Sequence, residues 1–213
     1  MDAKAPVKIG AFSRGGHNRV DVNALDHDFK PDAILTPFSL LLPKHDELFI
    51  FMAESKITSD FIWDRMEDIW PHIKAKYHPN ILVLNQDNGP ENNSRRTQFI
   101  KRAVEFSKRY NITIRLAYYP PYHSKYNPVE RTHGALEQHW NGILLLDIDT
   151  ALKAAADMRW KGKHPVVELI SETYAKGVKL SKAAMAKYER SLKRLVGLGK
   201  WFVDIEPCPV GLG

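Results

Sequence analysis

A run of four apolar residues that ends in a polar turn is the feature that most constrains the fold of this chain. Ile81-Leu82-Val83-Leu84 is followed by Asn85-Gln86-Asp87-Asn88-Gly89. A continuous apolar run of this length is typical of a strand buried on both faces, as in the middle of a covered parallel sheet. Because ligands bind at the carboxyl ends of such strands, Asp87 is well placed to bind a metal ion. Taken alone, the motif is better explained as a turn that Asp87 opens.

The order of the other segments predicts an α/β protein with a mixed sheet and helices on both faces. An antiparallel meander comes first, and helices and strands then alternate up to a helix that starts at Pro128. Residues 147–195 read as helices with Lys-rich surfaces, and 201–205 as a late extended piece. The expected strands are 7–12, 33–42, 47–53, 80–86 and 112–118, and the expected helices are 58–77, 94–110 and 128–145.

The helix expected over 94–110 is basic and amphipathic. Its apolar residues recur on one face, and Arg102 and Arg109 are among the basic residues expected to point mostly outward. A charged helix face is usually a solvated face, so this pattern by itself does not indicate a nucleic-acid surface.

Composition limits the classes of protein that fit. The chain has 213 residues, a formal net charge of +6 and one cysteine, Cys208, so no disulfide forms within it. It shows neither a membrane-spanning run nor a signal peptide. We therefore predict a cytoplasmic protein, and the positive charge is compatible with a polyanionic partner.

A second polar motif begins the helix expected at residue 128. Asn127 is a good N-cap, Pro128 suits the first helical position, and Glu130 lies three residues after the cap. The motif is explained either as a capping box, which stabilises a helix by about 1 kcal/mol, or as a cation site. In the second case Glu130 and Asp87 are expected to share a divalent cation.

Two segments together resemble a known family. They are Gln86-Asp87-Asn88-Gly89-Pro90-Glu91 and Tyr119–Arg131, which reads Y-P-P-Y-H-S-K-Y-N-P-V-E-R. Their residues and order resemble the catalytic core of DDE transposases and retroviral integrases. The second segment resembles the Y-x-P-x-x-S-x-x-N-P-x-E block of bacterial insertion-sequence and mariner-like transposases, which is far more specific than an isolated D-N-G. The resemblance covers residues 1–145.

The resemblance implies an RNase H-like fold in which three catalytic carboxylates hold two Mg²⁺ or Mn²⁺ ions. Asp87 matches the second carboxylate and Glu130 the third, and we assign the first to Asp2, on the first strand. Two such ions about 3.5–4 Å apart activate the attacking oxygen and stabilise the leaving oxygen in cleavage and strand transfer. Little of the first strand precedes Asp2, so alternatives stay open: Asp21, Asp26, Asp28 or a lost residue.

Other residues are expected to surround these carboxylates. Asn88 and Gly89 would shape the rim beside Asp87, and Asn127 would shape the start of the helix that carries Glu130. His133, one helical turn after Glu130, is interpreted as a surface histidine. The alternative is that it lies next to the side chains that bind the metal.

DNA is the partner that the resemblance implies. His123, Lys125 and Arg131 are candidates for contacts to phosphate, with ordinary solvation as an equal alternative. The loop from Arg14 to Arg19 is better explained as solvated than as a DNA contact.

The sequence thus predicts a DNA transposase catalytic domain that acts as a homo-oligomer. We expect an RNase H-like core over 1–146 and a helical extension over 147–213 that packs on it. The family's upstream DNA-end-binding region is missing, which indicates a fragment or truncated reading frame. The alternatives are another RNase H-like nuclease, and an inactive remnant that binds DNA or acts in assembly.

Overall fold

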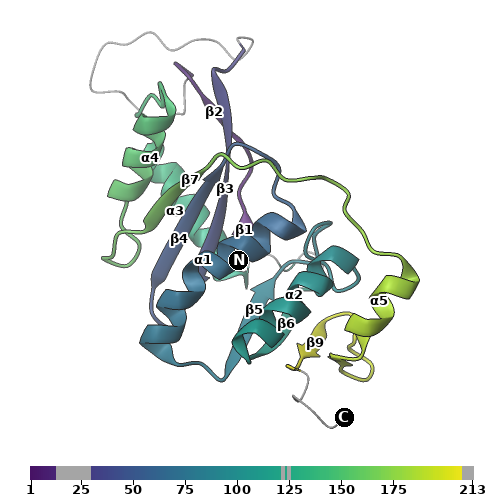
Figure 1. The fold of residues 1–213 in the computed structure, drawn as a ribbon. Coiled ribbons are helices and arrows are strands. Elements are labelled where there is room, and N and C mark those ends of the chain that lie inside the picture. Colours follow the sequence, from purple (N-terminus) through teal and green to yellow (C-terminus); the bar gives the residue numbers. More distant parts are fainter. Residues whose placement is uncertain (13–29, 121–122, 124–125, 208–213) are drawn as a thin grey trace. The chain divides into compact units, whose positions relative to one another are not determined.

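The computed structural model describes residues 1–12, 30–120, 123 and 126–207. The chain forms two compact units and passes between them repeatedly. The first unit comprises Met1–Lys56 and Asn127–Thr173, and the second comprises Ile57–Tyr126 and Tyr174–Gly213. Figure 1 shows the helices and strands of both units.

The sheet of the first unit confirms the predicted antiparallel meander. Strand β3 pairs antiparallel with β1, β2 and β4, and β7 joins β4 in parallel, so that the sheet is mixed. In this register Asp2 of β1 lies opposite Ser39 of β3. The strands are β1 (Asp2–Ala3), β2 (Val7–Ile9), β3 (Ala33–Leu42), β4 (Glu47–Ala53) and β7 (Val166–Ile170).

Two helices, α3 (Pro128–Trp140) and α4 (Ile148–Asp157), cover one face of this sheet (Figure 1). Leu136 and Trp140 of α3 and Ala151 of α4 share a buried core with apolar residues of β2, β3 and β4. The spacing of the apolar residues in α3 therefore determines which face of the helix packs on the sheet and which face carries polar residues.

The second unit has its own mixed sheet, with the order β5-β6-β9-β8 in the described part. β5 (Ile81–Gln86) pairs in parallel with β6 (Thr113–Tyr118), while β9 (Phe202–Ile205) runs antiparallel to both β6 and β8 (Leu192–Arg194).

The prediction that β5 is buried on both faces is wrong. Ile81 and Val83 are 47% and 48% exposed, whereas Leu84 and Gln86 are buried. β5 lies at the end of the sheet order, and its residues alternate between a covered and an open face. Among the strands that the structure describes, β4 is the one buried along nearly its whole length, from Leu48 to Ala53.

Helices α1 (Ser59–Tyr77) and α2 (Thr97–Tyr110) pack side by side in the second unit (Figure 1). Thr58 caps α1 by accepting a hydrogen bond from the backbone N–H of Phe61. The two helices meet through aromatic side chains, including Trp63 and Phe106, whose ring centroids are 5.3 Å apart.

The basic residues of α2 are less free than the sequence suggested. Arg102 is partly buried and pairs with Asp60 of α1 at 2.9 Å and with Asp64, and Arg109 pairs with Glu67. Arg102 therefore does not point outward as expected, because acidic residues of α1 attract its guanidinium. Much of the positive charge of α2 is neutralised within the second unit.

Residues 147–213 contain strands as well as the expected helices. Besides α4 and α5 (Lys182–Glu189), this stretch supplies β7, β8 and β9, and the extended piece predicted at 201–205 is confirmed by β9. Residues up to Thr173 join the first unit and those from Tyr174 the second. The description of these residues as one helical extension is thus corrected, while the functional boundary at residue 146 stays a prediction.

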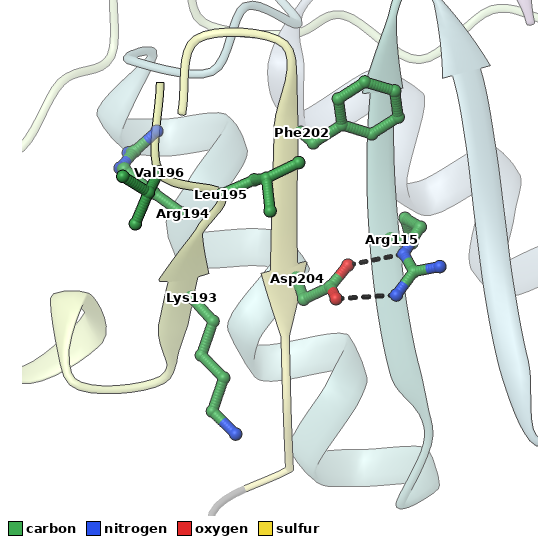
Figure 2. Close-up of a pocket in the computed structure, with 7 residues that line it drawn as sticks. All are labelled: Arg115, Lys193, Arg194, Leu195, Val196, Phe202 and Asp204. Carbon is green, nitrogen blue, oxygen red and sulfur yellow. Dashed lines mark hydrogen bonds and ion pairs between the residues drawn. The ribbon is translucent and has the colours of Figure 1, made fainter. Parts of the chain in front are cut away.

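A bidentate ion pair joins β6 to β9. The Arg115 guanidinium donates two hydrogen bonds to Asp204, of 2.7 and 2.8 Å, beside a cavity of about 480 Å³ (Figure 2). Phe202 and Val196 also line this cavity, and Val196 is 97% exposed. The pair ties the late strand β9 to the middle of the sheet.

No helix within the described ranges combines the length and the apolar character needed to cross a membrane.

Candidate metal centre

The N-terminus of α3 is tied to the first residues of the chain. Asn127 caps the helix, as predicted, by accepting from the N–H of Val129, and Pro128 occupies the first helical position. Asn127 is 2% exposed, and its side-chain amide donates to the carbonyl of Met1 at 3.4 Å. One buried side chain therefore holds both the start of α3 and the residue next to Asp2.

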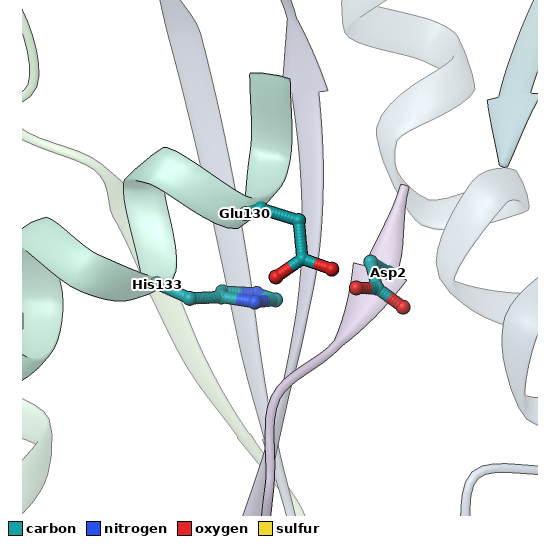
Figure 3. Close-up of side chains that lie close together, drawn as sticks. All are labelled: Asp2, Glu130 and His133. Atoms are coloured by element: carbon teal, nitrogen blue, oxygen red, sulfur yellow. The ribbon is translucent and has the colours of Figure 1, made fainter. Parts of the chain in front are cut away.

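This arrangement brings together two of the three predicted carboxylates. Asp2, Glu130 and His133 each offer one ligand atom, and these atoms all lie within 4.8 Å of one another. Figure 3 shows the Glu130 carboxylate between Asp2 and the His133 ring. The three side chains line a cavity of about 300 Å³, with Lys4 and Glu137 on its wall.

His133 is not the surface histidine that the sequence favoured. It is 6% exposed, and its Nε2 has no hydrogen-bond partner among the described residues. Burial, and then the charge of Lys4, lowers the pKa of His133 to about 4. The imidazole is therefore neutral near pH 7 and keeps a nitrogen lone pair. The signal for its position was present, because Val129, Thr132, Leu136 and Trp140 mark the buried face of α3 around it.

Lys4 defines one edge of the cavity. Its ammonium forms a salt bridge of 2.6 Å with Glu137, one of the later residues of α3. The ammonium of Lys4, which lines the same cavity, is thus paired with a carboxylate other than Glu130. Sequence reasoning did not identify Lys4 as part of this wall.

The donors fit a divalent cation. Carboxylate oxygens are the preferred ligands of Mg²⁺ and Mn²⁺, and a neutral imidazole binds transition metals. One ring nitrogen of His133 lies in the same group of ligand atoms, and its Nε2 is enclosed and has no hydrogen-bond partner in the described part of the chain. A buried polar nitrogen is normally satisfied by a partner, so an ion would complete the bonding at this position.

Asp87 belongs to the second unit, where it directly follows β5. The side-chain amide of Asn92 donates to its Oδ1 at 3.1 Å. A Cβ added at Gly89 would lie 2.8 Å from Asn92 Oδ1 and 3.4 Å from both Asp87 carboxylate oxygens. Asn88 accepts a hydrogen bond of 3.4 Å from the N–H of Ser94. Asn88 and Gly89 therefore shape the surroundings of Asp87, and the shared cation of Asp87 and Glu130 stays a prediction.

Asn92 is itself held in place from two sides. It is 8% exposed, its carbonyl accepts the Tyr118 hydroxyl at 2.8 Å, and its amide also lies 3.4 Å from Gln86 Oε1. The sequence analysis missed Asn92, although it lies only five residues after Asp87 in the same turn-rich segment. The carboxylate of Asp87 is oriented by a side chain with little freedom.

A comparison with family models gives a match over nearly the whole chain. The chain matches the model described as the Rhodopirellula transposase DDE domain over residues 1–207. It belongs to this family. The match includes most of the residues after 145, to which the motif resemblance does not extend. No curated protein and no solved structure matches the chain.

Membership in the DDE family supports a transposase role and the α/β, RNase H-like fold that the mixed sheets and flanking helices display. Of the residues predicted to contact DNA in this DDE domain, His123 is exposed and stacks on Tyr126 with centroids 5.6 Å apart, and Arg131 is exposed on α3. Lys125 lies outside the described residues, as do the 14–19 loop and the alternative first carboxylates Asp21, Asp26 and Asp28.

Proposed function

We propose that this chain is the part of a DNA transposase that cleaves phosphodiester bonds and transfers strands with Mg²⁺ or Mn²⁺, and that Asp2, Asp87 and Glu130 hold the ions. The proposal rests on one observation. Asp2 and Glu130 are far apart in sequence, and yet their ligand atoms lie within 4.8 Å of each other. Membership in a DDE transposase family gives that pair its chemical meaning.

The chain's own residues have defined tasks in this proposal. Asp2 and Glu130 supply carboxylate oxygens, and Asp87 supplies a third carboxylate that Asn92 orients. When bound, the ions supply Lewis acidity at phosphate and lower the pKa of the attacking water or hydroxyl. The protein needs no nucleophilic side chain, so these residues serve to hold and orient.

DNA is the proposed partner, and phosphate contacts are the proposed role of His123, Lys125 and Arg131. His123 and Arg131 are exposed, as phosphate contacts require. A homo-oligomeric active assembly remains part of the proposal, which rests on the family resemblance.

The first prediction tests Glu130. Glu130→Gln removes the charge but keeps a side chain that serves at this position of a helix. We expect nicking of supercoiled plasmid in Mg²⁺ or Mn²⁺ to fall by more than about 100-fold, because loss of even an outer-shell metal partner costs about 10–100-fold. Asp87→Asn and Asp2→Asn are expected to behave alike in gel assays.

Asp149→Asn is the matched control. Asp149 is also an acidic residue in the first turn of a helix, α4, and it lies outside the cluster. The Asp149→Asn variant should retain nicking. This result would separate the loss of metal binding from the loss of an acidic residue that merely stabilises the first turn of a helix. Nicking that survives both Glu130→Gln and Asp87→Asn contradicts the proposal. Duplex binding without any metal-dependent nicking in the parent chain would identify the inactive DNA-binding module instead.

A further inference from the structure

We infer that His133 is a nitrogen ligand of the cation that Asp2 and Glu130 hold. The inference rests on the proposed function and adds a ligand that the carboxylate motif does not contain. It also assigns a metal preference, because an imidazole adds affinity for first-row transition ions such as Mn²⁺ more than for Mg²⁺.

The distances support a common ion. Two ligand atoms that each lie about 2.1–2.2 Å from one ion are at most about 4.4 Å apart. The ligand atoms of Asp2, Glu130 and His133 are within 4.8 Å of one another, so shifts of a few tenths of an ångström (~0.4 Å) bring all three into range. In Figure 3 the three side chains converge from β1 and from the first turns of α3.

The helix fixes two of these ligands relative to each other. Glu130 and His133 are separated by three residues, so they project from the same side of α3. The helix is anchored on its core face by Val129, which is 1% exposed, and Leu136, which is 0% exposed. His133 thus reaches the carboxylates from a rigid element.

The bonding of His133 is incomplete without a ligand. The residue is more than nine-tenths buried, and Nε2 has no hydrogen-bond partner in the described part of the chain. Such nitrogens are rare in folded proteins unless water or an ion satisfies them. The adjoining cavity of about 300 Å³ has room for an ion and its waters.

The ammonium on the cavity wall pairs with a carboxylate outside the cluster. The Lys4 ammonium contacts Glu137 at 2.6 Å, and an ammonium has only donors to offer. A divalent ion is the kind of group that binds two carboxylates and a neutral imidazole together.

The test uses the full chain loaded with Mn²⁺ and pulsed EPR, which detects nitrogen bound to the ion. We expect ¹⁴N coupling that changes to the ¹⁵N pattern when the histidines are ¹⁵N-labelled. His133→Gln should abolish this coupling and weaken Mn²⁺ binding about 10–100-fold in calorimetry, with a smaller change for Mg²⁺. If His133→Gln fails to fold, loss of the coupling in Glu130→Gln assigns the nitrogen to this site.

His139→Gln is the control on the same helix. His139 is 32% exposed at its side chain, lies 3.9 Å from Asp157 and is outside the cluster, so its variant should keep the coupling. Mn²⁺ binding that depends on Asp2 and Glu130 but shows no histidine coupling overturns this inference and leaves the proposed function intact. The absence of any Mn²⁺ binding that depends on Glu130 overturns both.

Discussion

The orientation of Asp87 depends on Gly89. Because Gly89 has no side chain, Asn92 has room to approach the Asp87 carboxylate. Asn92 reaches the Asp87 carboxylate at 3.1 Å, and Gly89 stands where any Cβ would come within 2.8 Å of the Asn92 amide oxygen. Asn92 cannot move away easily, because it is also hydrogen-bonded to Tyr118 and Gln86. The D-N-G sequence is therefore explained by packing around a carboxylate as well as by turn formation.

Gly89→Ala should break the contact between Asn92 and Asp87. We expect a loss of about 1.5–3 kcal/mol in the free energy of unfolding, the usual contribution of a hydrogen bond to a charged group. Urea unfolding measures it, and metal-dependent nicking should fall as well. Gly134→Ala is the control for stability alone, since Gly134 also lines the cavity beside Glu130. Its added Cβ meets nothing within 4 Å and lies in α3, where Ala stabilises by about 0.5–1 kcal/mol. Equal stability of parent and Gly89→Ala contradicts this account.

The sequence predicted part of the candidate site. Motif order identified Asp2 and Glu130, which the structure brings together. It did not identify His133 as buried, because a histidine beside a charged motif has no fixed exposure until the helix face is known. The buried positions of α3 show which face of the helix meets the core. The spacing of the apolar residues in this segment could therefore have predicted that His133 is buried. Asn92 could not be found, since its role depends on the path of an irregular turn.

At the scale of elements, the differences between sequence and structure come from partners far along the chain. A local apolar run predicted β5 correctly as a strand, but its exposure depends on which elements cover it, and Ile81 and Val83 remain open. Similarly, β8 and β9 are short, and β9 pairs with β6, which is about 90 residues earlier. β8 has too little local pattern to be recognised, and the extended piece predicted at 201–205 does not indicate that its partner is β6. The meander, with nearest-neighbour pairing, was predicted well.

The Arg115–Asp204 pair between β6 and β9 makes a prediction about pH. The hydrogen bonds from Arg115, with the charges of Arg115 and Lys193, hold the pKa of Asp204 below its ordinary value. A depressed carboxyl pKa stabilises the fold above the unfolded pKa, and this contribution is lost as pH falls through the folded pKa. Asp204→Asn should therefore cost about 0.2–1 kcal/mol at pH 7, as for exposed pairs, and nothing in strong acid.

Urea unfolding of parent and Asp204→Asn at pH 7 and at stepwise lower pH, to below the folded pKa of Asp204, measures that difference. In an Arg115→Gln background the Asp204 substitution should have a much smaller effect at pH 7, since the partner is gone. A difference that stays constant down to the lowest pH shows that the ion pair is not its source.

At the scale of the whole molecule, the count of 31 lysines and arginines overstates the cationic surface that is open to DNA. Arg102 and Arg109 are engaged with acidic residues of α1, whereas Arg131 is exposed near the start of α3. The positions of basic residues, more than their number, therefore determine which of them contribute to binding a polyanion.

Arg131→Gln should weaken binding to duplex DNA and reduce the salt dependence. Each phosphate contact that is lost lowers the slope of log K against log salt concentration by about 0.9. Fluorescence anisotropy with a labelled duplex between about 50 and 200 mM salt measures this slope. Arg102→Gln should leave the slope unchanged, because its guanidinium is paired with Asp60 and Asp64. If Arg102→Gln changed the slope and Arg131→Gln did not, the DNA would bind at a surface other than the one that carries Arg131.

The discontinuous make-up of the first unit has a consequence for the chain during its synthesis on the ribosome. The apolar residues of β2, β3 and β4 are covered by Leu136, Trp140, Ala151 and Met158, which are made much later. About 100 residues separate Met52 from Met158, which is roughly 5–20 s of elongation at ordinary rates. During that interval the nascent meander has no helices to cover this face. Chaperones that bind exposed apolar strands therefore have a defined window in which to act on this protein.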